Sequence, residues 1–173
     1  NEQEVMDNIG TIANSGTRKY LESLDKDKAQ DSNLIGQFGV GFYSAFIVSN
    51  TVTLISRKAG DKKSNGTKWV SKGKGEYSIE KIEVENYGTS ITLDLKKSES
   101  EFIDDYRIRG IVSKYSDHIT VPILMCKPSD EEGVIEYETI NKANAFWTQD
   151  KKKLSQEDYD EFYKSLTYDF EGP

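Results

Sequence analysis

Polar and apolar positions alternate over much of residues 49–140, with the period of two that is typical of β-strands. Most of these runs are followed within a few residues by glycine, asparagine or proline, which favour turns. The pattern predicts strands at 51–57, 67–71, 77–82, 89–95, 119–125 and 134–140. The short turns between the first four runs predict mostly antiparallel pairing.

Helical patterns surround these strands. Apolar residues three and four apart predict a helix over residues 2–9, and a nearly all-apolar run predicts a buried helix over residues 42–49. Capping patterns that begin at Ser98 and at Ser155 predict the starts of two further helices. The chain therefore belongs to the α+β class in this prediction.

Composition and charge narrow the range of partners. The net charge of the 173 residues is −7, and a nucleic-acid partner is disfavoured because phosphate backbones require a basic face. No stretch approaches the roughly 20 apolar residues of a membrane-spanning helix. Cys126 is the one cysteine, so no disulfide can form within the chain, which fits a reducing compartment. We expect a cytoplasmic protein that binds neither nucleic acid nor membrane.

The strongest candidate for chemistry is a glycine-rich loop. Residues 36–44 read Gly-Gln-Phe-Gly-Val-Gly-Phe-Tyr-Ser, directly before the apolar run of the predicted helix. Glycine lets main-chain amides converge, and the start of a helix leaves further amides free to bind a phosphate. The loop by itself fits a tight turn before a buried helix equally well.

Neighbouring segments favour the phosphate interpretation. Residues 8–17 read Asn-Ile-Gly-Thr-Ile-Ala-Asn-Ser-Gly-Thr, and Gly88-Thr89 opens a predicted strand. With these motifs the chain resembles the nucleotide-binding domain of the heat shock protein 90 family of chaperones, in particular its bacterial members. The likeness continues through 114–118, 146–148 and 161–164, and so covers nearly the whole chain.

The resemblance implies a fold and a division into domains. The expected fold is a two-layer α/β sandwich of the GHKL (Bergerat) ATPase type, with helices on one face of a mostly antiparallel sheet, incomplete at its N-terminal side. Residues 1–140 would be a partial ATP-binding domain with a lid at about 10–41. Residues 141–173 would be a linker and the first helix of a middle domain. We therefore expect the chain to be a fragment of a longer protein.

The resemblance also implies a nucleotide site for ATP or ADP with Mg²⁺. Loop amides would dominate the affinity for the phosphates, because each hydrogen bond to a charged group contributes roughly 1.5–3 kcal/mol. The residues expected to bind the nucleotide are Asn8, Asn14, Gly36, Gln37, Phe38, Gly39, Val40, Gly41, Phe42 and Thr89.

Three of these residues could instead have a purely structural role, and a fourth differs in chemistry from its counterpart in close relatives. Asn8 is either a ribose or phosphate contact or a residue that caps the end of a helix. Thr89 either supports the adenine or is an ordinary strand residue. Phe42 lines the pocket or belongs to the core. Asn14 stands where close relatives carry a lysine, so it offers a hydrogen-bond donor without a positive charge.

The catalytic groups of the family match no position in this chain. Its general base and the ligands of Mg²⁺ would lie largely outside residues 1–173, so we assign no catalytic residue and no metal ligand here. The parent protein is expected to be an ATPase, and this chain alone is expected to be inactive.

The function implied is that of an ATP-dependent chaperone that closes its lid, dimerises and acts on client proteins with co-chaperones. Two alternatives are a non-catalytic interaction module and another GHKL ATPase of the MutL or topoisomerase type.

Overall fold

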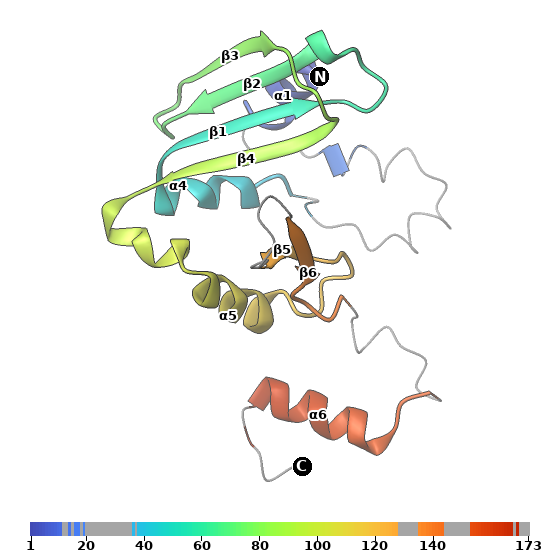
Figure 1. The fold of residues 1–173 in the computed structure, drawn as a ribbon. Helices are drawn as coiled ribbons and strands as arrows, with labels where there is room; N and C mark the ends of the chain where they lie inside the picture. The colour runs from blue at the N-terminus through green and yellow to red at the C-terminus, as the bar shows by residue number, and fades with distance from the viewer. Residues whose placement is uncertain are drawn as a thin grey trace. The chain divides into compact units, whose positions relative to one another are not determined.

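The computed structural model describes residues 1–11, 14, 16–17, 19, 36, 38–127, 135–143, 153–167 and 169. They fall into two compact units, divided between Glu101 and Phe102 (Figure 1). Most of the predicted lid at about 10–41 lies outside the described residues. The predicted domain boundary near residue 141 stays a prediction.

The first unit is built on a four-stranded antiparallel sheet in the order β3-β2-β1-β4. Figure 1 shows these strands side by side, with the short helix α1 (Glu2–Asn8) behind them. The strands are β1 (Ser49–Arg57), β2 (Gly66–Ser71), β3 (Tyr77–Ile82) and β4 (Gly88–Leu95), with the 3-10 turn η2 (Lys63–Asn65) before β2. This arrangement confirms the predicted α+β class and is consistent with an incomplete GHKL-type domain.

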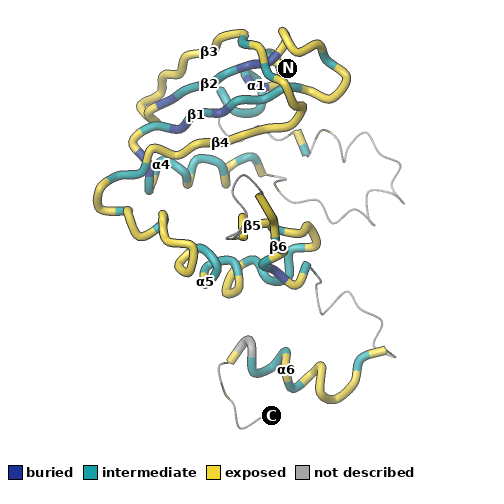
Figure 2. Tube along the Cα trace, viewed as in Figure 1, coloured by how far each residue is buried: buried dark blue, intermediate teal, exposed yellow. Residues whose placement is uncertain are grey.

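The core lies on one face of this sheet. Val52, Leu54 and Trp69 are at most 3% exposed, and Val5 of α1 packs on them. Phe42 of the 3-10 turn η1 (Gly41–Ser44) and residues of the following helix α4 (Ala45–Val48) complete the cluster. Figure 2 shows the buried segments on β1 and β2, whereas β4 is exposed along most of its length. The helices therefore cover the inner strands and leave one edge of this face open.

The prediction of a buried helix over residues 42–49 is wrong in one respect. The segment is helical up to Val48, but neither η1 nor α4 contains a buried residue, and Ile47 is 71% exposed. The reason is that the helix contacts the sheet with one side only, through Phe42, Ala45 and Phe46.

The second unit contains α5 (Asp105–Tyr115), the antiparallel pair β5 (Leu124–Lys127) and β6 (Glu136–Thr139), and α6 (Gln156–Thr167). Ser155 caps α6 as predicted, since its hydroxyl accepts from the Asp158 amide at 3.2 Å. The capping pattern at Ser98 does not start α5. Instead, Asp104 accepts from the Arg107 amide at 2.8 Å, and residues before it form the 3-10 segment η3 (Lys97–Ile103).

Asn141 holds the segment between α5 and β5. Asn141 is only 8% exposed, and its Oδ1 accepts a hydrogen bond from the Ile123 amide at 2.8 Å. Its Nδ2 donates to the carbonyl oxygens of Ile119 and Val121, each at 3.1 Å. With a longer bond to the Ser116 carbonyl at 3.4 Å, a single amide side chain thus bonds to four main-chain groups that belong to no helix or strand.

We expect Asn141→Ala to lower the free energy of unfolding of the second unit by about 1–3 kcal/mol, because it leaves buried main-chain groups without a partner. Amide hydrogen exchange at Ile123 measures the effect, and faster exchange is expected. Asn86→Ala removes an exposed asparagine of the first unit and serves as control. Equal exchange at Ile123 in both variants would contradict the role of Asn141.

No helix among the described residues has both the length and the apolar character needed to cross a membrane.

Candidate functional site

A cavity of about 490 Å³ lies in the first unit between α1, β1 and β4. Its apolar lining comes from Val5 and Ile9 on one side and from Leu54 and Ile91 of the sheet. Leu54 and Ile91 are register partners, so both point to the face that carries the core. Polar and charged side chains also line the cavity, and they include Asn8, Ser56 and Thr89.

Asn8 lines this cavity and carries a buried, unsatisfied acceptor. It is the last residue of α1, and its Oδ1 is buried without a hydrogen-bond partner among the described residues. The segment beyond the helix approaches its side chain closely, since a Cβ built on Gly16 would lie 3.4 Å from the Asn8 Nδ2. A buried acceptor without a donor costs about 1–3 kcal/mol, so Asn8 is suited to accept a hydrogen bond from a bound molecule.

Thr89 enters the same cavity from the start of β4. It pairs in register with Ser56 of β1, and the two hydroxyl oxygens are 2.8 Å apart. Ser56 also donates to the Gly88 carbonyl at 3.2 Å. The two hydroxyls therefore form a small polar patch beside apolar Leu54 and Ile91, an arrangement that orients a ligand while an apolar surface binds it.

The outer end of the cavity carries an ion pair. The Lys58 ammonium donates to Glu4 at 2.6 Å, and this hydrogen bond holds the pKa of Glu4 well below its ordinary value. The folded pKa lies below the ordinary value of 4.5, so this contribution to stability is present above pH 4.5 and is lost as the pH falls toward 2. The two charges offset one another at neutral pH.

The glycine loop lies against the segment that follows α1. Gly36 and Gly39 have positive φ angles of 87° and 66°. A Cβ on Gly39 would lie 2.4 Å from the Asn14 carbonyl oxygen, so only glycine allows this approach. The Asn14 Nδ2 in turn donates to the Asp7 carbonyl at 2.5 Å, which joins the loop to the end of α1.

The other predicted site residues lie in two different environments. Phe38 and Val40 are 70% and 53% exposed, and no atom lies within 4 Å of a Cβ built on Gly41. Phe42 packs edge-on against Trp69 in the core, with 5.8 Å between ring centroids, and is not among the described residues that line the cavity. Gln37 lies outside the described residues.

The structure thus brings Asn8 and Thr89 together in one cavity and places Asn14 against Gly39. Sequence reasoning missed the cavity residues Ile9, Leu54, Ser56 and Ile91. Ile91 had a signal, because it follows Thr89 by two residues and must share its face of the strand. Ser56 had none, since its position opposite Thr89 depends on the pairing register of β1 and β4. Among the described residues, no group of three or more His, Cys, Asp or Glu side chains is arranged to hold a metal.

Comparisons with known proteins support the family resemblance that the motifs indicate. A family model described as Hsp90 protein matches residues 127–173. The chain is 69% identical over 172 residues to the chaperone protein HtpG of Ruthia magnifica subsp. Calyptogena magnifica, and 54% identical over 172 residues to HtpG of Escherichia coli (strain K12). These alignments cover 99% and 98% of the chain, which spans 28% of the length of each relative. The chain belongs to the Hsp90 family.

Proposed function

We propose that this chain supplies part of the ATP-binding site of a chaperone of the Hsp90 type. The observation that carries the proposal is the cavity shared by Asn8 and Thr89, which are the two predicted site residues farthest apart in the sequence. The cavity volume of about 490 Å³ falls within the roughly 300–1,000 Å³ of typical small-molecule sites.

The cavity has the chemistry that a nucleoside requires. Apolar Leu54 and Ile91 provide a surface for a planar base, and the hydroxyls of Ser56 and Thr89 provide donors and acceptors for its polar edge. The unsatisfied Oδ1 of Asn8 accepts from a ribose hydroxyl or from a water that the ligand orders. In this proposal the adenosine part of ATP occupies the cavity.

The phosphates would lie toward the glycine loop. Consecutive main-chain amides around residues of positive φ form concave anion sites, and Gly36 and Gly39 supply such angles. Bound Mg²⁺ would neutralise phosphate charge and would take most of its oxygen ligands from the phosphates, from water and from residues outside this chain. The chain itself binds and orients the nucleotide in this proposal, and residues beyond it hydrolyse ATP.

The remaining features of the family are proposed for the longer protein. ATP binding would close the lid, slow hydrolysis would reopen it, and this cycle would act on client proteins with the help of co-chaperones. The longer protein would be a cytoplasmic homodimer.

Titration with ADP tests the nucleotide site. The protein to use is a chimera in which this chain replaces the matching segment of the Ruthia magnifica HtpG, because the chain spans 28% of that protein. Isothermal titration should detect ADP binding to the chimera. Absence of binding would favour a non-catalytic interaction module instead.

Asn8→Ala should weaken ADP binding by the chimera about tenfold, since it removes one hydrogen bond of about 1.4 kcal/mol. The same change should not lower the melting temperature, because the buried Asn8 Oδ1 has no hydrogen-bond partner to lose in the described part of the free chain. Asn65→Ala, an exposed asparagine in η2, is the matched control. If Asn8→Ala binds ADP as tightly as this control does, Asn8 is no part of the site.

A further inference from the structure

The helix that follows the glycine loop is very short. The 3-10 turn η1 leads directly into the four residues of α4, and β1 begins at the next residue. A helix of this length does not persist by itself, because few hydrogen bonds offset the entropy of ordering it. Its position therefore depends on what holds its ends.

Every carbonyl in the last turn of α4 has a partner from outside the helix. The Ser49 hydroxyl donates to the Ala45 carbonyl at 2.6 Å. The Lys96 ammonium donates to the carbonyls of Phe46 and Ile47, at 3.0 and 2.6 Å. The Lys96 main-chain amide donates to the Val48 carbonyl at 2.9 Å. A helix normally leaves its last four carbonyls unpaired, and here Lys96 satisfies three of them.

The sheet places Lys96 where it can donate to the carbonyls of α4. It is the first residue after β4, the strand that begins with Gly88 and Thr89 of the cavity. Its side chain is half-buried, and its positive charge lies at the negative end of the helix dipole. Lys96 thus links the C-terminal end of β4, the strand that lines the cavity, to the C-terminal end of α4, the helix that follows the glycine loop.

Tyr43 lies in the 3-10 turn η1, directly before α4, and anchors the opposite end of this segment. Its hydroxyl donates to the Thr11 carbonyl at 2.7 Å and lies 3.3 Å from the Ile9 carbonyl oxygen. Burial raises the pKa of the Tyr43 hydroxyl, so it remains a donor at neutral pH. Ile9 directly follows Asn8 and itself lines the cavity, and Thr11 lies two residues further along the chain, so this contact ties the turn before α4 to the other wall of the site.

We propose that Lys96 is a positioning residue for nucleotide binding. By fixing the C-terminal turn of α4 on the end of β4, it sets the distance between the cavity, which binds the adenosine part, and the glycine loop, which binds the phosphates. This inference rests on the proposed nucleotide site. Tyr43 acts in the same way from the N-terminal end.

Loss of the Lys96 contacts should reduce the affinity for one kind of ligand and not for the other. A ligand that occupies only the cavity does not depend on where the glycine loop lies, whereas a ligand with phosphates needs both parts in register. A lysine that merely stabilises the fold affects both ligands alike. The informative quantity is therefore the ratio of the affinities for ADP and adenosine.

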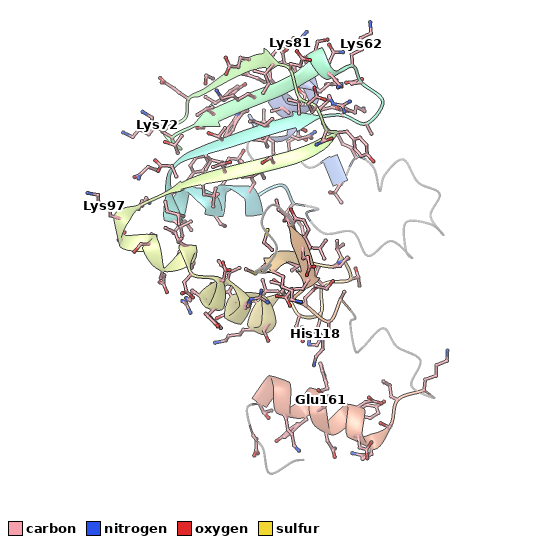
Figure 3. All side chains as sticks on the ribbon, in the orientation of Figure 1. Lys62, Lys72, Lys81, Lys97, His118 and Glu161 are labelled. Carbon is pink, nitrogen blue, oxygen red and sulfur yellow. The ribbon has the colours of Figure 1, made fainter. Side chains whose placement is uncertain are left out.

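The experiment compares Lys96→Met, Lys96→Arg and Lys97→Met in the HtpG chimera by isothermal titration with ADP and with adenosine. Lys97 is the matched control, because it is the adjacent lysine and Figure 3 shows it pointing away from the ribbon. Lys96→Met should bind ADP about tenfold more weakly and adenosine within twofold of the unsubstituted chimera. Lys96→Arg, which keeps charged donors, should restore most of the ADP affinity.

Equal losses for ADP and adenosine in Lys96→Met, or no loss for either, would overturn the positioning role while leaving the nucleotide site intact. Failure of the unsubstituted chimera to bind ADP would overturn the proposed function as well. Tyr43→Phe keeps the ring and removes only the hydroxyl, and it should show the same ADP-selective loss. It keeps the test decisive if Lys96→Met does not fold.

Discussion

Gly39→Ala is expected to weaken ADP binding by the HtpG chimera by at least about 100-fold. The added methyl group would lie 2.4 Å from the Asn14 carbonyl oxygen, and the backbone at this position has a φ of 66°. The loop must move away from residue 14, and it then loses two or more amide contacts to phosphate at roughly 1.5–3 kcal/mol each. Isothermal titration with ADP measures the loss.

Gly60→Ala is the matched control for this change. Gly60 has a comparable positive φ of 87°, but no atom lies within 4 Å of a Cβ built on it. Both variants therefore pay a similar backbone cost, and only Gly39→Ala has a steric conflict. ADP binding by Gly39→Ala at the affinity of Gly60→Ala would exclude the glycine loop from the nucleotide site.

Trp69→Ala should have the largest effect on stability, lowering the free energy of unfolding of the chain by about 3–5 kcal/mol. Trp69 is 2% exposed and packs against Phe42 and Tyr77, with 5.8 Å between ring centroids in each case. Removal of the indole leaves a cavity at the centre of the only buried cluster in the described part of the first unit. Urea unfolding followed by circular dichroism measures the change.

Trp69→Phe separates packing from hydrogen bonding. The Trp69 Nε1 is buried without a hydrogen-bond partner among the described residues, so the indole N–H contributes no bond that phenylalanine would lose. Trp69→Phe should therefore cost much less than Trp69→Ala. Tyr87→Ala, at a position 71% exposed, should change stability by at most about 0.5 kcal/mol. A loss in Trp69→Phe as large as in Trp69→Ala would show that the N–H is bonded in solution.

The strands of the sheet were predictable because their information is local. Alternation and glycine turns give β3 at Tyr77–Ile82 as predicted, and the other three strands of this sheet begin within two residues of the expected position. Helix burial was not predictable in the same way. The run over residues 42–49 is nearly all apolar, and Ile47 is exposed because the described helix contacts the sheet on one side only.

The site was predictable where a motif marks it. Asn8 and Thr89 are found from the segments that carry the family resemblance, and the cavity brings them together. Ser56 and Lys96 could not be found, because their roles depend on contacts between segments distant in sequence. Ser56 meets Thr89 across 33 positions, and Lys96 meets Phe46 across 50. No local pattern specifies such distances.

The open edge of the sheet has a consequence for the isolated polypeptide. β4 is an edge strand, and its Ile91 and Leu93 are 49% and 37% exposed although they are register partners of buried Leu54 and Val52. A long edge with apolar side chains is a template on which strands of other molecules add, the first step of cross-β aggregation. Asp94 is the one acidic side chain within this strand, and its charge opposes the stacking of identical copies.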